Sequence, residues 1–248
     1  MRLRLTLAAA TCFALPLAAT AQPVTGPYVN LEGGISILNP VNGVLEGPPV
    51  FFNAVSGDRF QFRPGYAGTV GAGYGFGNGF RVELDGDYTR NSVHADDYSF
   101  ENSYGTFNGR FTDHGAAERY GAMVNLLYDI PVGLPVFPYV GAGVGYQWVK
   151  LNRDITTSDP GFFGNNFPGF QAGGTRGSFA YDIIAGLSYP LPILPQLAIT
   201  AAYQFMMLTG SQNYATISPF GPGAPVNVEH LGQQSSSSFM LGLRYQFF

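Results

Sequence analysis

The chain has 248 residues, of which 46% are hydrophobic and 11% are charged, well below the roughly 25% charged residues of an average soluble protein. No run of about 18 apolar residues could cross a bilayer as a helix, and the net charge of −4 provides no basic surface for nucleic acid. With 34 Gly, 15 Tyr and 21 Phe, the composition favours strands and turns over helices.

Residues 1–21 have the features of a secretory signal peptide. Two arginines precede an apolar stretch from Leu5 to Ala19, and a small-residue cleavage site ends at Ala21. We therefore expect residues 22–248 to form the exported chain as a single domain. The only cysteine of the sequence, Cys12, lies in the signal, so we expect the exported chain to have no disulfide or cysteine-bound metal, and no motif indicates a cofactor.

Eight segments after the signal alternate between apolar residues and polar or small residues with a period of two. This is the pattern of a β-strand whose two faces meet different surroundings. Each segment has about ten residues, the length that a tilted strand needs to cross a bilayer. In chain order the segments are 29–37, 66–76, 80–89, 119–129, 140–148, 179–189, 197–207 and 238–247.

The connections between these segments alternate between short and long. The short ones are 77–79, 131–136 and 190–196. The long ones, which we expect to be loops because they are rich in Gly, Pro, Asn and Ser, are 38–63, 91–118, 150–177 and 209–235. The pattern predicts an all-β fold, an eight-stranded antiparallel up-and-down transmembrane barrel with short periplasmic turns and long extracellular loops.

The charged residues of the eight segments all fall on one strand face. Because an eight-stranded barrel is only wide enough to be filled by side chains, we expect them to form a network of ion pairs and hydrogen bonds in the lumen. The register favours Arg81 with Asp129 and Glu32 with Arg244. The residues of this predicted lumen network are Glu32, Arg81, Glu83, Asp85, Asp87, Arg119, Asp129, Asp182 and Arg244.

The opposite strand face carries no charge and has aromatic residues near its ends. An apolar band between two aromatic girdles is typical of a barrel wall in contact with lipid, whereas a soluble barrel with so few exposed Lys and Glu would aggregate. We therefore expect outer-membrane lipid and lipopolysaccharide as partners. The predicted girdle residues are Tyr74, Phe76, Phe80, Tyr88, Tyr120, Tyr128, Trp148, Tyr189 and Phe247.

Four segments resemble the OmpA-like outer-membrane β-barrel family: RVELDGDY at 81–88, VNLLYD at 124–129, PYVGAGVGY at 138–146 and LGLRYQF at 241–247. The resemblance extends over essentially all of the chain after the signal. It implies an eight-stranded barrel with a plugged interior in the outer membrane of a Gram-negative bacterium, reached after export to the periplasm.

The resemblance also implies that the barrel-insertion machinery reads an aromatic residue at the end of the last strand. The candidates for this insertion signal are Tyr245, Phe247 and Phe248, and the residue at the recognition position is left open between the two phenylalanines. Longer members of the family carry a peptidoglycan-binding domain after the barrel. Because this sequence stops at the last predicted strand, we do not carry that role over.

Glycine recurs at every second position in 71–75 and in 141–145. No helix pattern follows either run, so we interpret these glycines as small inward-facing residues that leave room for bulky neighbours, not as nucleotide-binding loops. The acidic run Glu83, Asp85 and Asp87 offers either a cation site or, as we favour, counter-charge to the lumen arginines.

Histidines occur at 94, 114 and 230, all in the long connections. Glu229 and His230, followed by Ser235–Ser238, offer the residue types of an enzyme acting on lipid A, but no spacing places a nucleophile beside a base. Several loop phenylalanines could form an adhesive surface for an extracellular ligand, pack on one another, or extend the strands, since Phe60 and Phe62 continue the parity of Tyr66. These phenylalanines are Phe51, Phe52, Phe60, Phe100, Phe107, Phe162 and Phe163.

The sequence thus favours a non-enzymatic barrel that supports the envelope and displays its loops at the cell surface. A narrow, weakly cation-preferring pore is the second hypothesis, because the predicted lumen face is acidic. A lipid A-modifying enzyme is the third.

Overall fold

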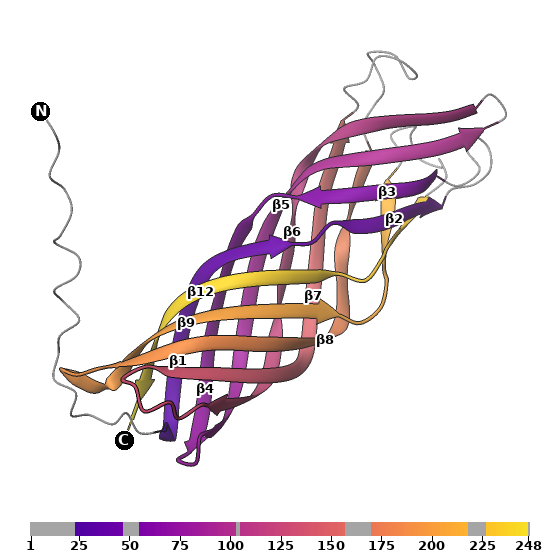
Figure 1. Ribbon diagram of the computed structural model, residues 1–248. Coiled ribbons are helices and arrows are strands. Elements are labelled where there is room, and N and C mark those ends of the chain that lie inside the picture. Colours follow the sequence, from indigo (N-terminus) through magenta and orange to yellow (C-terminus); the bar gives the residue numbers. More distant parts are fainter. Residues whose placement is uncertain (1–22, 47–54, 103–104, 157–169, 218–226, 248) are drawn as a thin grey trace, which may run out of the picture.

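The structure is a computed structural model that describes residues 23–46, 55–102, 105–156, 170–217 and 227–247. The described strands form one antiparallel sheet that closes on itself as a long barrel (Figure 1). No helix in these ranges is long and apolar enough to cross a membrane. The predicted fold class, a closed eight-stranded antiparallel barrel, is confirmed. The predicted signal peptide lies outside the described residues.

The barrel wall has eight strand positions, four of which hold one uninterrupted strand each and four of which are divided by a short interruption. The uninterrupted strands are β5 (Phe80–Asn102), β6 (Gly105–Asp129), β7 (Phe137–Thr156) and β8 (Phe170–Leu191). The divided positions hold β1 (Thr25–Leu38) with β2 (Val41–Glu46), β3 (Val55–Phe62) with β4 (Gly65–Phe76), β9 (Leu194–Leu208) with β10 (Gln212–Ile217), and β11 (Asn227–Leu231) with β12 (Ser235–Gln246).

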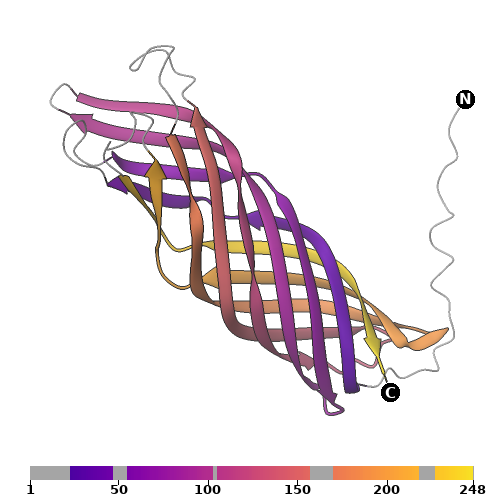
Figure 2. The same cartoon turned by 180° about the vertical axis from the view of Figure 1, so that it is seen from behind.

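The strands close into a ring at two levels. The lower ring, toward the short turns, runs β1–β4–β5–β6–β7–β8–β9–β12 and back to β1. The upper ring runs β2–β3–β5–β6–β7–β8–β10–β11 and back to β2. Strands β5 to β8 therefore belong to both rings, and the view from behind shows them running the length of the barrel (Figure 2).

The interruptions fall in four neighbouring wall positions and have local causes. Pro40 and Pro64 have no backbone N–H to donate to a neighbouring strand. Gly210 adopts a φ of 99°, in the left-handed region that other residues avoid. Between these points the wall remains bonded, for example from the Asn39 N–H to the Ser235 carbonyl at 3.0 Å.

The three short connections are confirmed as turns between adjacent strands. In the first, Gly77 and Gly79 have φ values of 76° and 95°, and the Asn78 side-chain oxygen accepts a hydrogen bond from the Phe80 N–H at 3.1 Å. The other two join β6 to β7 and β8 to β9. All three lie at the end of the barrel where β12 finishes (Figure 1).

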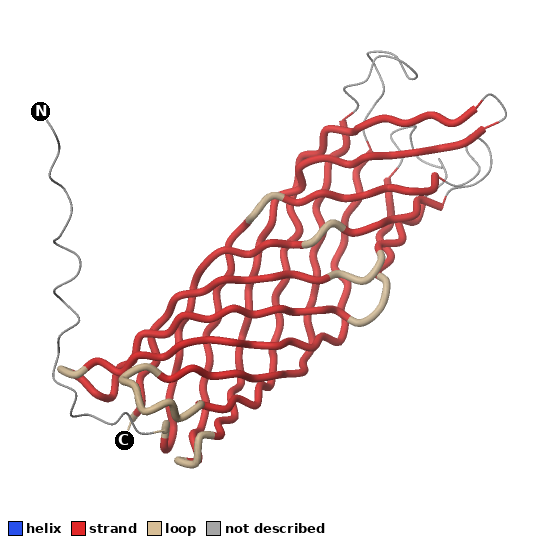
Figure 3. The backbone as a smooth tube through the Cα atoms, in the orientation of Figure 1, coloured by secondary structure: helices blue, strands red, loops and turns tan. Residues whose placement is uncertain are grey.

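The prediction that the four long connections are loops is wrong for most of their described residues. They contain β2, β3, β10 and β11 and the outer halves of β5 to β8, so the strands continue well past the predicted ends (Figure 3). We call this outer part of the barrel the collar: the described residues of 39–63, 90–118, 149–177 and 209–234. The histidines at 94, 114 and 230 accordingly lie in β5, β6 and β11, not in loops.

The collar went unrecognised because its side chains reverse the polarity of the lower wall. In the lower ring the outward residues are apolar, as shown by Val144, which is 66% exposed, and Leu241, which is 69% exposed. In the collar the outward residues are polar, including Asn42, Arg90, Ser92, Lys150 and Asn152. Its interior includes a buried apolar cluster formed with Leu38 at the end of β1, and the collar members of this cluster are Val41, Phe60, Ala117, Leu151, Tyr214 and Leu231. The collar is thus built for water outside, and the lower ring for lipid.

Phe60 shows how the alternation is reset between the two levels. Its predicted outward parity with Tyr66 is wrong, because Phe60 is 2% exposed and packs inside the collar, while Tyr66 is 54% exposed on the outer wall. A register shift between Gln61 and Phe62 and the interruption at Pro64 separate the two residues.

The two-level arrangement predicts which positions a membrane-impermeant maleimide reaches. Introduced cysteines can be labelled specifically, because Cys12 is the only native cysteine in the sequence. Asn152→Cys on the collar should label on intact cells. Val132→Cys, in the short turn after β6, should label only after the outer membrane is permeabilised. Val144→Cys, exposed but facing lipid, should label only in the denatured protein. The unmodified chain gives the background labelling. Labelling of Val132→Cys on intact cells would show that the barrel has the opposite orientation in the membrane.

Candidate functional site

The nine charged residues of the predicted lumen network all lie on the inner face of the lower ring. Eight are buried, and Glu32 is half-buried. Strand β5 carries four of them in a column that rises from the short-turn end, Arg81, Glu83, Asp85 and Asp87. Successive inward residues stand two positions apart along one strand, so the column places three carboxylates directly above one arginine.

Arg81 holds the lower end of the lumen together. Its guanidinium lies 2.9 Å from Asp129 Oδ1 and 3.8 Å from Glu83 Oε2. It also donates a hydrogen bond to the Tyr28 hydroxyl at 3.3 Å and lies over the rings of Tyr28 and Tyr139, at 5.5 and 5.0 Å from their centroids. One buried cation thus contacts two carboxylates and two aromatic faces, which compensates part of its lost hydration.

The predicted direct pair of Glu32 with Arg244 is not formed. The register sets Arg244 opposite Asn30 and Glu32 opposite Gly242, two positions apart along the strand. Glu32 accepts a hydrogen bond from Thr200 at 2.8 Å, and Arg244 donates one to Ser188 at 2.9 Å. Sequence reasoning found the right face but not the register that fixes which partners meet.

Most of the remaining lumen charges are held by neutral hydrogen-bonding groups. Arg119 donates to Ser236 at 2.7 Å. Four carboxylates receive amide or hydroxyl donors: Glu83 from Asn30 at 2.9 Å, Asp85 from Asn125 at 2.6 Å, Asp87 from Thr69 at 2.9 Å and Gln147 at 3.4 Å, and Asp182 from Gln204 at 2.6 Å. Charged groups bonded in this way lose less on burial than bare charges.

These neutral partners were missed from the sequence, although a signal for them exists. Asn30, Asn125 and Gln204 share the strand face of the charged residues, as do Tyr28 and Tyr139. A search for all polar residues of that parity would have included them. In the described part of the chain, no three His, Cys, Asp or Glu side chains are grouped so that they could hold a metal ion, and this includes the acidic run of β5.

The alternating glycines face inward and make room for the network, as predicted. A methyl group added at Gly71 would overlap side-chain oxygens of Asn30 and Asp85. One added at Gly143 would overlap the side chain of Asn125 and lie 2.6 Å from Asp182 Oδ1. The glycine faces of β4 and β7 are therefore the surfaces on which the polar side chains of neighbouring strands lie.

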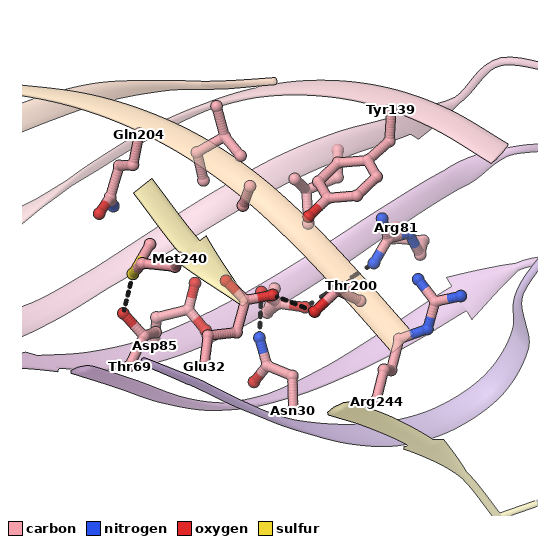
Figure 4. Close-up of a pocket in the computed structure, with 14 residues that line it drawn as sticks. Asn30, Glu32, Thr69, Arg81, Asp85, Tyr139, Thr200, Gln204, Met240 and Arg244 are labelled. Atoms are coloured by element: carbon pink, nitrogen blue, oxygen red, sulfur yellow. Dashed lines mark hydrogen bonds and ion pairs between the residues drawn. The ribbon is translucent and has the colours of Figure 1, made fainter. Parts of the chain in front are cut away.

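Between the charged side chains lies a cavity of about 20 Å³ (Figure 4). Its lining includes Glu32, Asp85, Tyr139, Thr200 and Arg244. A space of this size holds about one water molecule.

Apolar side chains fill the lumen beside this cavity and on its collar side. A buried cluster of Leu127, Tyr139, Ile184 and Ala202 lines the cavity itself. A second cluster lies toward the collar and consists of Met123, Val149, Ala180, Met206 and Leu208. The apolar core of the collar follows above it, so buried side chains occupy successive levels of the barrel.

The nine predicted girdle residues all lie on the outer wall, where Tyr128 and Tyr189 are half-buried and the others are exposed. Tyr88, Tyr120 and Trp148 form one row across β5, β6 and β7. Phe80 lies opposite Tyr128 in a lower row, with ring centroids 4.8 Å apart. Eight residues separate Phe80 from Tyr88, which is about 20 Å along the membrane normal for a strand tilted by about 40°.

That separation is close to the height of the apolar band of an outer-membrane barrel, so the two rows mark its edges. Further aromatic residues that the sequence analysis did not assign to the girdle join them. Tyr66 lies beside Tyr88, with ring centroids 6.0 Å apart, and Tyr146 contacts both Trp148 and Phe179.

At the end of the last strand, Tyr245 lies on β12 with its ring 5.4 Å from that of Phe247. The Phe247 N–H donates to the Pro27 carbonyl at 3.1 Å, which ties the chain end to β1. Phe248 lies outside the described residues, so the residue read by the insertion machinery remains a prediction.

The serines that suggested an enzyme fall on both sides of the barrel wall, because Ser235 and Ser237 face outward and Ser236 and Ser238 face the lumen. His230 lies on the outer side of β11, with Nδ1 2.8 Å from Asn213 Oδ1. Ser236 points into the lumen, where it accepts the hydrogen bond of Arg119. Of the predicted adhesive phenylalanines, Phe100 and Phe107 lie opposite each other on β5 and β6, while Phe51, Phe52, Phe162 and Phe163 lie outside the described residues.

The closed barrel, its polar lumen and its aromatic rows define an outer-membrane protein. The model of the outer membrane protein beta-barrel domain family matches residues 5–247, and the chain belongs to this family. It is 34% identical over 257 positions to an outer membrane protein of Gluconacetobacter diazotrophicus, which covers 100% of this chain and 64% of the relative. The chain therefore spans less than two thirds of that relative's length.

Two further comparisons agree with this class. An uncharacterised protein of Brucella abortus is 28% identical over 211 residues, covering 77% of this chain and 71% of its own. The crystal structure of the outer membrane protein OprG from Pseudomonas aeruginosa superposes with a TM-score of 0.59 at 13% identity, covering 92% of this chain and 100% of that one. At that identity the likeness concerns the fold alone.

Removing Arg81 should destabilise the barrel strongly, because Asp129 and Glu83 would be left buried without their cation. We expect Arg81→Met to lower the free energy of unfolding by about 3–5 kcal/mol, measured by denaturant titration in lipid vesicles. Arg90→Met removes an arginine whose side chain is 47% exposed and should cost at most about 1 kcal/mol. Equal losses in the two variants would contradict the role given to Arg81.

Replacing glycine by alanine should destabilise the barrel at inward-facing positions but not at outward-facing ones. Gly143→Ala forces Asn125 and Asp182 to move and should cost about 1–3 kcal/mol. The control is Gly33→Ala, where the added carbon meets only the Ala67 carbonyl oxygen at 3.8 Å and should be tolerated. The stability of both variants is measured as the temperature at which the folded band disappears from gels of unboiled samples. This temperature should fall only for Gly143→Ala.

Proposed function

We propose that this protein is a plugged outer-membrane barrel that supports the envelope and presents a stiff collar at the cell surface. The observation that carries the proposal is the filled lumen of the lower ring. The cavity in its polar layer has room for about one water molecule, one apolar cluster lines that cavity, and a second apolar cluster fills the lumen toward the collar. A wall of this kind serves as a membrane anchor better than as a passage.

The alternative, a narrow cation-preferring pore, draws on the same residues. Six carboxylates and three arginines face the lumen, so its inner surface is acidic. A passing cation would have to separate the buried contacts of Arg81 and then cross the layer of Met123 and Met206, whose side chains offer little to replace its hydration. The packing therefore favours the plug.

The collar supports the display role. Its strands are hydrogen-bonded into a ring, and its outward residues are polar. A ligand at the cell surface would therefore meet this polar wall.

Single-channel recording in planar bilayers tests the plug. We expect fluorescently labelled protein to insert without discrete openings. The double variant Met123→Gly and Met206→Gly removes part of the apolar layer and should produce openings under the same conditions, which shows that the assay detects a path through this barrel. Regular cation-selective openings of the unmodified protein would overturn the proposal and support the pore.

A further inference from the structure

A row of charged residues lies on the outer wall immediately beyond the upper aromatic row. In the register, Arg90 lies opposite Glu118, and Glu118 lies opposite Lys150. Each of them is two residues from its aromatic counterpart in the row of Tyr88, Tyr120 and Trp148. Since side chains alternate between the faces of a strand, both rows point away from the barrel.

The charged row is an ordered cluster with cations in excess. One carboxylate, that of Glu118, lies 3.3 Å from the Arg90 guanidinium and 3.6 Å from the Lys150 ammonium. The two basic side chains are 47% and 53% exposed, and Glu118 is 23% exposed. Glu118 therefore holds both cations in place while most of their N–H donors remain available to a ligand.

Two more arginines extend the positive charge along the same edge. Arg63 is exposed beside β5, where its guanidinium lies 2.9 Å from His94 Nδ1 and its backbone N–H donates to the Ser92 carbonyl at 2.8 Å. Arg176 is exposed on β8, the strand paired with β7, and donates to the Asn213 carbonyl at 2.6 Å. Four cations and one carboxylate thus follow the upper edge of the lipid-facing band, in a chain whose net charge is −4.

The distribution of basic residues is one-sided. Apart from the three arginines of the lumen, all Lys and Arg between residues 23 and 247 lie on the collar side of the upper aromatic row, and none lies on the outer wall below it. They are Arg59, Arg63, Arg90, Arg110, Lys150, Arg153 and Arg176. The described Asp and Glu residues outside the lumen lie on the same side, so the excess of cations is local to the row of Arg90, Glu118 and Lys150. A partner that binds this row must be anionic.

The position of the row narrows the chemistry of the partner. Aromatic girdles lie at the level of lipid headgroups, so a residue two positions further out meets the headgroup and not the acyl chains. Arginine and lysine at that level match phosphate oxygens, arginine through paired N–H donors and lysine as a point charge. The outer leaflet of a Gram-negative outer membrane consists of lipopolysaccharide, whose lipid anchor carries phosphates on its sugars.

We propose that Arg90 and Lys150, positioned by Glu118 and extended by Arg63, bind the lipid A phosphates of lipopolysaccharide. The acyl chains of the bound lipid lie along the wall below Tyr88, Tyr120 and Trp148. Binding at this edge fixes the height of the barrel relative to the outer leaflet. The proposal depends on the location in the outer membrane and not on whether the lumen conducts.

Trp148 provides a reporter at the site, because it is the only tryptophan in the sequence and stacks on Tyr120, with ring centroids 5.9 Å apart. The protein, folded in a zwitterionic detergent, is titrated with diphosphorylated lipid A while the Trp148 emission is recorded. We expect a saturable change. The double variant Arg90→Gln and Lys150→Gln should weaken the apparent affinity by at least about ten-fold, since two charge-assisted contacts are lost.

Two single variants distinguish this site from general charge attraction. Arg59→Gln removes an exposed cation that lies opposite Asp97, about 20 Å further along the collar, and should leave the affinity unchanged. Glu118→Gln keeps an oxygen that can accept a hydrogen bond from the neighbouring cations but removes the negative charge that competes with phosphate, so it should tighten binding. A structural role of Glu118 alone would not produce that increase.

The lipid series decides the source of the phosphate. Monophosphorylated lipid A should bind more weakly than the diphosphorylated form, and phosphatidylglycerol more weakly than either. The proposal is overturned if the double variant binds like the unmodified protein, if Arg59→Gln weakens binding as much, or if phosphatidylglycerol binds equally well. Retention of the folded band in unboiled gels verifies that each variant is folded.

Discussion

The requirement that every backbone N–H and C=O be hydrogen-bonded in hydrocarbon governs the whole molecule. Lipid offers no substitute partner, so the strands in the membrane must close into a ring. Closure at eight strands in turn fixes a narrow interior that side chains fill. The inward column of β5, the glycine faces of β4 and β7, and the small polar cavity all follow from that one constraint.

The same ring continues beyond the membrane with its chemistry reversed. Below the upper aromatic row, Val144 and Leu241 face lipid while Asp85 and Arg81 face inward. Above it, Leu151 and Phe60 are buried inside while Lys150 and Asn152 face water. One backbone architecture thus serves two solvents, and the height at which the side chains exchange faces marks the boundary between them.

Sequence reasoning identified the lower ring almost completely, since a clean alternation of charged and uncharged faces is what a lipid-facing wall produces. It assigned Arg81, Asp85 and Asp182 to the correct face from parity alone. It could not pair Glu32, because contacts across strands depend on register, and the register places Gly242 opposite that residue. Asn30 and Asn125, which bond to the charged residues, lie on the same strand face, but the predicted network included only charged residues.

The collar could not be recognised in the same way. Its strands keep the period of two, but their polar outer face and interruptions such as those at Pro64 and Gly210 are what loops also show. The pairing that defines it joins segments as distant as β2 and β11. Such pairing depends on the three-dimensional closure of the ring.

The shared strands give the barrel direction-dependent mechanics. Strands β5 to β8 pass unbroken from the lower ring into the upper one, whereas the other four wall positions are each interrupted. A load on the collar is carried by continuous strands on one side and, on the other, by strand positions that each pass through two or three residues outside a strand. The collar therefore bends more readily on the interrupted side, so a load tilts it along one preferred axis.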